Sequence, residues 1–343
     1  MTAPNTVVPV IDISGFLAGT DLVSAPQQVR EAATRSGFFQ IVGHGVAAGL
    51  LDAVYQKSIE LAQTPPEYQQ SLVSPEGHPY RGLTTNIDKS GQVRSLRVHA
   101  SNFDDPTDAQ RAGVAPELSD FFSPNVWPDV IAGYRTAIRS LFECTQRLGN
   151  ALMRIFAVAL DLPIDYFDGF VEPAASSCSI NYYPPRNAPL IEHPTIIFDE
   201  HFDGGTLTIL HQRGTYAGLQ VKTISGEWFP VPVIEEAFVI NMGELMMRWT
   251  NGLWPATRHR VIASEDPAGH RTTLTTFHLP AVDTVIEPLK TTYGPQGPQF
   301  EPVAVYDWES RFIKKAYAER THTRPAGITQ AYVKRLTEEE EIS

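Results

Sequence analysis

Short apolar stretches separated by turn residues fill the second half of the chain. Within them, β-branched and aromatic residues alternate with polar ones, a period of two that favours half-buried strands. The segments Ser225-Gly226-Glu227 and Asp266-Pro267-Ala268-Gly269 have the composition of turns. The predicted strands cover residues 177–183, 200–210, 218–223, 228–233, 237–241, 259–263 and 271–279. Many short strands with such turns are typical of a β-sandwich or jelly roll.

Apolar residues recur at helical spacing in the first half of the chain and again at its end. The longest predicted helix spans residues 128–160, where Ile138, Leu152 and Phe156 belong to one apolar stripe. We expect it to be a scaffold helix packed outside the barrel. Further helices are predicted at 26–35, 50–62, 306–320 and 328–338, and strands at 7–12 and 38–42. The segment 75–106 is rich in polar residues and is predicted to be an irregular loop.

These elements indicate a mainly β protein with flanking helices. Its predicted core is a double-stranded β-helix (jelly roll) at 111–300, which contains the scaffold helix. Residues 1–110 form an N-terminal region of helices and strands that is integral to the fold, and 301–343 form C-terminal helices. Because no linker-like stretch divides the chain, we expect one catalytic unit.

Composition narrows the possible partners. The net charge is −12 with a pI near 5.3, which argues against nucleic acid and against an anionic membrane surface. No apolar run reaches the ~18 residues of a membrane helix, and the first residues lack the features of a signal peptide. The two cysteines, Cys144 and Cys178, are too few for a disulfide scaffold. We therefore expect reduced thiols and a cytoplasmic protein.

Two histidines and a carboxylate are the candidate metal ligands. Alternate side chains of a strand share a face, so His201 and Asp203 project together if 200–210 is a strand. A third ligand has to come from a later strand, and His259 qualifies. Two histidines and one carboxylate on one face of a metal form the facial triad of non-haem Fe(II) oxygenases. A single His-x-Asp is common by chance, and an ordinary surface or core histidine is the alternative for His201.

An arginine follows the candidate triad at the start of the next strand. The period of two puts Arg271, Thr273 and Phe277 on one face. An arginine that points into a barrel needs an anionic partner, because an unpaired buried charge is costly. A planar guanidinium suits a carboxylate, so this arrangement fits a chelating keto acid whose far carboxylate binds Arg271.

Several separated segments, in order, resemble the 2-oxoglutarate/Fe(II)-dependent dioxygenase superfamily, in the isopenicillin N synthase-like branch. The resemblance covers roughly residues 7–320 and is far more specific than any single motif. Five residues differ from the family's usual pattern. Thr273 and Thr257 stand where serine is common, and Trp254 stands where a lysine, arginine or other polar residue is common. Phe202 and Gly204 are unusual residues beside the ligands. The similar segments are Val8-Pro9-Val10-Ile11-Asp12-Ile13-Ser14, Ser36-Gly37-Phe38-Phe39-Gln40-Ile41-Val42-Gly43-His44-Gly45-Val46, Asn181-Tyr182-Tyr183-Pro184-Pro185, His201-Phe202-Asp203-Gly204-Gly205-Thr206-Leu207-Thr208, Asn251-Gly252 through His259-Arg260-Val261, and Arg271-x-Thr273.

The resemblance implies a set of cofactors and roles. His201, Asp203 and His259 would hold Fe(II), and the co-substrates would be 2-oxoglutarate and O2. Arg271, Thr273 and Tyr183 would hold the far carboxylate of 2-oxoglutarate, with Asn181 on the same face. The expected reaction is oxidation, by default hydroxylation, of a C–H bond in a small molecule of secondary metabolism, with succinate and CO2 as co-products.

The substrate is less well specified. In the family, the region around 75–106 contributes a substrate-facing loop, which makes Tyr80, Arg81 and Arg97 candidates, and for each of them an ordinary solvated loop residue is the alternative. Phe198 and Phe277 are further candidates beside the metal. If the substrate is anionic, Arg81 or Arg97 would bind it. The sequence does not distinguish a monomer from a homodimer.

Three other functions remain open. An oxidase of the same branch would work without 2-oxoglutarate and would use Arg271 and Thr273 for the substrate's own carboxylate. A metal-bound jelly-roll isomerase or hydrolase would not need dioxygen. A binding protein on a former oxygenase scaffold would not turn over at all.

Overall fold

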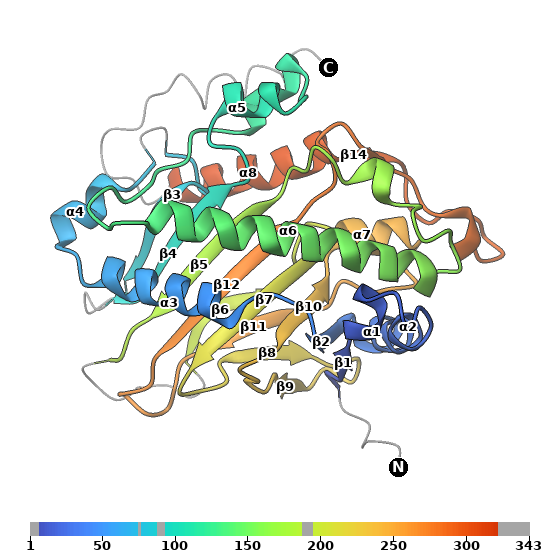
Figure 1. Cartoon of the computed structure of the whole chain (residues 1–343), viewed down its shortest axis with the longest axis horizontal. Coiled ribbons are helices and arrows are strands. Elements are labelled where there is room, and N and C mark those ends of the chain that lie inside the picture. Colours follow the sequence, from blue (N-terminus) through green and yellow to red (C-terminus); the bar gives the residue numbers. More distant parts are fainter. Residues whose placement is uncertain (1–6, 75–76, 88–92, 187–194, 322–343) are drawn as a thin grey trace.

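The computed structural model describes residues 7–74, 77–87, 93–186 and 195–321, which form two β-sheets with helices packed around them (Figure 1). The larger sheet has eight strands, antiparallel except for the parallel pair β1 and β2. Its strands, in spatial order, are β1 (Val10–Asp12), β2 (Phe38–Val42), β10 (Phe238–Met242), β7 (Leu207–Gly214), β12 (Arg271–His278), β5 (Ser177–Tyr183), β4 (Val93–Ser101) and β3 (Gly82–Ile87).

The smaller sheet faces the larger one across an internal cavity that residues of both sheets line. Its strands, in spatial order, are β6 (Ile196–His201), β11 (His259–Ile262), β8 (Leu219–Lys222) and β9 (Trp228–Pro230). A separate pair joins β13 (Val285–Ile286) to β14 (Val303–Ala304). Two facing antiparallel sheets connected in this way form the predicted jelly roll, which is confirmed.

The predicted scaffold helix is α6 (Tyr134–Ala159), and it crosses the outer face of the larger sheet (Figure 1). Its apolar stripe includes Ile138, Leu152 and Phe156, all buried, and it packs on β7 and β12. The remaining helices are α1 (Ser14–Leu17), α2 (Ser24–Ser36), α3 (Ala48–Ala62), α4 (Pro66–Ser71), α5 (Pro106–Arg111), η1 (Pro116–Phe121), η2 (Asp168–Phe170), α7 (Glu244–Trp249), η3 (Lys290–Thr292) and α8 (Val305–Thr321). Within the described ranges, none of the helices combines the length and apolarity that crossing a bilayer would need.

The larger sheet draws strands from two of the regions proposed from sequence. Strands β1 to β4 come from residues 1–110, and β5, β7, β10 and β12 come from 111–300. The N-terminal region is thus built into the catalytic sheet. The predicted helix at 328–338 lies outside the described residues.

The segment 75–106 is not the irregular loop that we predicted. It contains β3 and β4, which extend the larger sheet beyond β5. Leu96, Val98 and Ala100 are buried on one face of β4, while Arg97 and His99 line the cavity on the other. The polar residues of this strand made the segment resemble a solvated loop, because they face an internal cavity rather than an apolar core.

The predicted strand at 200–210 is also corrected. Strand β6 ends at His201, β7 begins at Leu207, and Asp203 lies in the connection between the two sheets. This connection passes close to other backbone: a Cβ on Gly205 would lie 3.1 Å from the carbonyl oxygen of His278. Two consecutive glycines therefore suit the crossing from one sheet to the other.

Candidate metal centre and co-substrate pocket

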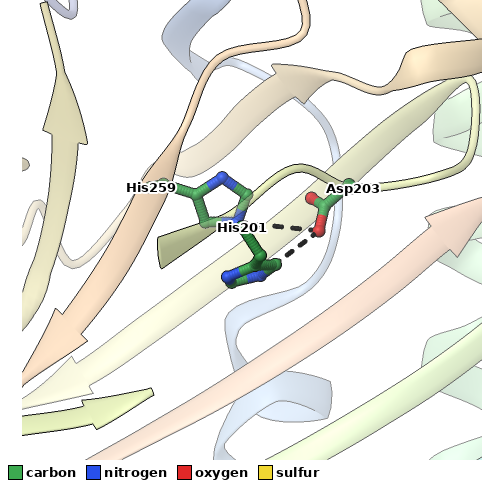
Figure 2. A group of neighbouring side chains, drawn as sticks. All are labelled: His201, Asp203 and His259. Carbon is green, nitrogen blue, oxygen red and sulfur yellow. Dashed lines mark ion pairs between the residues drawn. The ribbon is translucent and has the colours of Figure 1, made fainter. Parts of the chain in front are cut away.

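The three candidate ligands converge at one point between the sheets (Figure 2). His201 and His259 are directly paired across β6 and β11, and Asp203 reaches them from the connection to β7. One ligand atom from each residue lies within 4.8 Å of the other two. Asp203 Oδ1 is 3.7 Å from His201 Nε2 and 3.6 Å from His259 Nε2. The histidine and carboxylate donors therefore all point into the same small space.

Backbone carbonyls orient both histidine rings. His201 Nδ1 lies 2.8 Å from the carbonyl oxygen of Asp199, and His259 Nδ1 lies 3.1 Å from that of Thr257. When Nδ1–H donates to a carbonyl, the lone pair is on Nε2. In both rings Nε2 is the atom that faces Asp203. This arrangement favours, in both imidazoles, the tautomer that a metal ligand requires.

Two donors fix the orientation of the Asp203 carboxylate. Its Oδ2 accepts hydrogen bonds from Thr208 Oγ1 at 2.5 Å and from Asn241 Nδ2 at 2.7 Å. Because Oδ2 is occupied, Oδ1 is left facing the two histidines. Asn241 was not among the residues predicted from the sequence, and Thr208 was named only as the last residue of the similar segment that begins at His201. A polar residue in an otherwise apolar strand is the one signal that could have indicated Asn241.

The electrostatics of the site favour an ionised carboxylate and at least one neutral histidine. Burial opposes ionisation of Asp203, but the two histidines and the bond from Asn241 outweigh it and hold the pKa of Asp203 well below its usual value. Burial, followed by the proximity of His259, lowers the pKa of His201 to about 4. Burial would lower the pKa of His259 as well, but Asp203 raises it. His201 is therefore an uncharged nitrogen ligand at neutral pH.

A buried arginine occupies the same cavity. Arg271 is 1% exposed, and its Nη2 donates to Gln212 Oε1 at 3.0 Å. Its Nε and Nη1 are buried and have no hydrogen-bond partner among the described residues. A buried cation with two unused donors is unstable unless a ligand supplies an anion. The donor set of the triad fits Fe(II), and the unpaired edge of Arg271 fits a carboxylate of 2-oxoglutarate.

The other predicted co-substrate residues surround Arg271. Tyr183 is its cross-strand partner on β5, and the guanidinium carbon lies 5.3 Å from the Tyr183 ring centroid. The Thr273 hydroxyl accepts a hydrogen bond from Asn181 Nδ2 at 3.0 Å, which leaves its own proton free to donate. Asn181 is in turn held by Ser179. Asn181 thus orients Thr273, which the sequence pattern could not indicate.

The cavity has a volume of about 150 Å³. Four of the five predicted substrate contacts line it: Tyr80, Arg97, Phe198 and Phe277. The fifth, Arg81, does not, and this part of our prediction is corrected. Arg81 is 4% exposed, and its guanidinium donates to the backbone carbonyls of Ser123, Tyr80 and Phe121. It secures the segment that follows α5 rather than binding a substrate.

The unusual tryptophan at the distal-histidine segment has a structural role. Trp254 is fully buried, and its ring packs against Phe156 of the scaffold helix with centroids 5.4 Å apart. Nearby, Thr257 Oγ1 donates to the carbonyl oxygen of Ser36 at the end of α2. These two contacts fix the segment that leads into His259, so the departure from the usual pattern leaves the metal site intact.

Comparisons with known proteins agree with this geometry. A family model described as the 2OG-Fe(II) oxygenase superfamily matches residues 174–280, which include all three candidate ligands and Arg271. A second, the N-terminal region of the non-haem dioxygenase in morphine synthesis, matches residues 8–130.

Individual relatives match over most of their length. The 2-oxoglutarate-dependent dioxygenase thnC of Trichoderma harzianum is 28% identical, covering 81% of this chain and 86% of its own. The structure of JOX2 in complex with 2OG, Fe and JA has a TM-score of 0.71 and 26% identity, covering 89% of this chain and 84% of the other. The dioxygenase for auxin oxidation in rice shares the fold, with a TM-score of 0.69, 20% identity, and coverage of 93% and 97%.

Both halves of the chain thus match models of non-haem dioxygenases, and the residues quoted for the resemblance meet at one site. The chain belongs to the 2-oxoglutarate/Fe(II)-dependent dioxygenase superfamily.

Proposed function

We propose that this protein is an Fe(II)- and 2-oxoglutarate-dependent dioxygenase that hydroxylates a C–H bond of a small metabolite, with succinate and CO2 as co-products. One observation carries the proposal: a two-histidine, one-carboxylate group shares a cavity with a buried arginine that has two unpaired nitrogens. When bound, the iron and the keto acid supply the oxidising power of the reaction. The chain supplies position, charge and a pocket lined by both apolar and polar side chains.

Each element of the site has a defined task. The triad would hold the metal through three donors, and the iron would supply the oxidising chemistry together with the co-substrate. Gln212 holds the guanidinium of Arg271 in place, and Arg271 and Thr273 would bind the far carboxylate of 2-oxoglutarate. Fixing that carboxylate would orient the rest of the molecule, so that the reacting groups would meet without a large entropic cost.

We also propose a size class for the substrate, a role in secondary metabolism and a cytoplasmic location. A pocket of about 150 Å³ is smaller than those that hold drug-sized ligands, which supports a compact metabolite as substrate. The match to the N-terminal region of a dioxygenase in morphine synthesis supports secondary metabolism. The thiols of Cys144 and Cys178 are both unpaired, in keeping with a reducing compartment such as the cytoplasm.

The test is an anaerobic titration of the metal-free protein with Fe(II) and then 2-oxoglutarate, followed by the weak visible charge-transfer band of the chelate. We expect the band in the wild type and its loss in His201→Ala. In Arg271→Gln we expect 2-oxoglutarate to bind at least ~30-fold more weakly, because removing one partner of a buried charge pair costs about 2–5 kcal/mol. His270→Ala, at an exposed histidine next to Arg271, is the matched control.

The outcome separates this proposal from its rivals. If iron binds but no band forms, the result favours the oxidase that works without 2-oxoglutarate, in which Arg271 binds the carboxylate of the substrate. If no iron binds, the result excludes both the dioxygenase and the oxidase. Succinate released in proportion to substrate consumed, once a substrate is known, distinguishes the dioxygenase from that oxidase directly.

A further inference from the structure

A second arginine, Arg97, also lines the cavity. It lies on β4, two strands away from β12, which carries Arg271. In the sheet register, Arg97 of β4 pairs with Asn181 of β5, which pairs with Thr273 of β12. Residues paired in register project from the same face of a sheet. The Arg97 side chain therefore points into the cavity, two strands away from Thr273.

Arg97 has no anionic partner in the part of the chain that the structure describes. Its guanidinium carbon lies 4.2 Å from the centroid of the Phe198 ring, and its Nε is buried without a hydrogen-bond partner. Arg81, by contrast, donates to three backbone carbonyls. A cation–π contact does not satisfy the N–H donors of the guanidinium. The charge of Arg97 is therefore available to a ligand.

The position of Arg97 separates it from the co-substrate. Strands two apart in a sheet are roughly 10 Å from each other, so one small carboxylate does not bind both Thr273 and Arg97 at once. Phe198, on which Arg97 rests, lies beside the metal ligand His201, with ring centroids 4.4 Å apart. An anion on Arg97 would thus sit on the metal side of the cavity, where a substrate has to be.

The surroundings of Arg97 define the rest of the ligand. Tyr80, His99, Phe198 and Phe277 line the cavity, which makes this part of it rich in rings. Flat apolar groups pack well against ring faces and edges. Among the described residues, Arg97 and Arg271 are the only arginines or lysines that line the cavity, so the ligand meets one free cation rather than the several that a phosphate group prefers.

We propose that the substrate is a small monocarboxylic acid with a flat, apolar body, and that Arg97 binds its carboxylate while Phe198 and Phe277 contact the body. This inference rests on the proposed function, because it assigns the co-substrate to Arg271. Holding the carboxylate at Arg97 would fix which carbon of the body faces the metal. Arg97 would then determine both the substrate class and the position that is oxidised.

The experiment compares acids with their uncharged equivalents on the anaerobic complex with Fe(II) and 2-oxoglutarate. The probes are benzoate, phenylacetate and 3-phenylpropanoate, their primary amides, and phenyl phosphate. Calorimetry measures probe binding, and the visible band measures the co-substrate separately. The variants are Arg97→Gln and Arg97→Lys. Arg260→Gln is the control, because Arg260 packs on Trp228 and bonds Gln220, away from the cavity.

We expect at least one acid to bind roughly tenfold or more tightly than its amide. Arg97→Gln should remove that preference and leave the band unchanged, which also shows that the variant is folded. Arg97→Lys should retain part of the preference, since it keeps the charge but loses the planar fork. Arg260→Gln should behave as the wild type.

Other results overturn the proposal in distinguishable ways. If no acid is preferred while the band forms, or if the phosphate ester binds best, the carboxylate assignment fails and the proposed function stands. If Arg97→Gln weakens the band itself, Arg97 belongs to the co-substrate. If the wild type gives no band, the proposed function fails first.

Discussion

At the scale of single residues, the hydrogen bonds behind the metal ligands fix how the ligands are oriented. Asp203 would bind a metal through Oδ1 because Thr208 and Asn241 occupy Oδ2. Thr208→Val keeps the size of the side chain but removes one donor. We expect Fe(II) affinity to fall by about 10–100-fold, the usual effect of losing a partner behind a metal ligand.

The measurement is the Fe(II) dissociation constant under anaerobic conditions, with circular dichroism to verify the fold. Thr206→Val is the matched control, since Thr206 bonds His278 rather than Asp203. An unchanged affinity in Thr208→Val would mean that Asn241 alone orients the carboxylate.

Residue identity and spacing, together with the family resemblance, indicated the candidate groups for binding the metal and 2-oxoglutarate. His201, Asp203, His259 and Arg271 were all found in this way, and the structure brings them into one cavity. The two nearby arginines, Arg81 and Arg97, could not be distinguished, because each is a cation in a polar segment. Only the structure shows that Arg81 donates hydrogen bonds to backbone carbonyls and that Arg97 faces the cavity.

At the scale of elements, the scaffold helix and the sheet meet at a glycine. A Cβ on Gly149 of α6 would lie 2.4 Å from the ring of His278 on β12. That ring cannot easily move, since it is fully buried and Asn150 and Thr206 hold its two nitrogens. Gly149→Ala gains about 1 kcal/mol of helix propensity but incurs an overpacking cost of about 1–3 kcal/mol.

We therefore expect Gly149→Ala to lower the free energy of unfolding by up to about 2 kcal/mol. Gly49→Ala in α3 is the matched control, because nothing lies within 4 Å of the added carbon there. It should stabilise the protein by up to about 1 kcal/mol. Denaturant unfolding measures both. If Gly149→Ala instead raises the free energy of unfolding, the His278 ring can move to make room for the added carbon.

Helix α8 carries a carboxyl group that gives stability an unusual pH dependence. Burial, and then the proximity of Glu244, raise the pKa of Glu309 from 4.5 to about 7. A carboxyl whose pKa is higher in the folded state stabilises the fold while it is protonated. Its contribution is complete below about pH 4.5 and is lost as the pH rises through about 7.

Glu309→Gln should therefore melt at a higher temperature than the wild type at pH 8, and the difference should shrink as the pH falls toward 5. The comparison isolates Glu309, because the other titrating groups are common to both proteins. Asp307→Asn, at an exposed position on the same helix, should show no such trend. A constant difference between pH 5 and 8 would refute this assignment.

At the scale of the whole molecule, the candidate site joins the two sheets. The histidines come from the smaller sheet, Arg271 and Thr273 come from the larger one, and Asp203 comes from the connection between them. Periodicity predicted most of these strands but not how they are divided between sheets. That division depends on pairing between residues far apart in sequence. At Asp203 the sequence shows no clear break between two strands, so the crossing from one sheet to the other was not predicted.

A ligand that contacts both sheets should stabilise the whole fold, and a redox-stable ion such as Mn(II) allows this to be tested by thermal melting. We expect Mn(II) alone to bind the triad, and saturation at about 100 times its dissociation constant should add about 2.7 kcal/mol, or several degrees in Tm. 2-Oxoglutarate should add little without the metal, because Arg271 then holds only one end of it, but it should add several degrees more with Mn(II).

Asp203→Ala should lose both shifts, whereas Arg271→Gln should keep the shift from the metal and lose the increment from 2-oxoglutarate. Equal shifts from 2-oxoglutarate with and without Mn(II) would show that the co-substrate binds one sheet only, and that the metal does not connect it to the other.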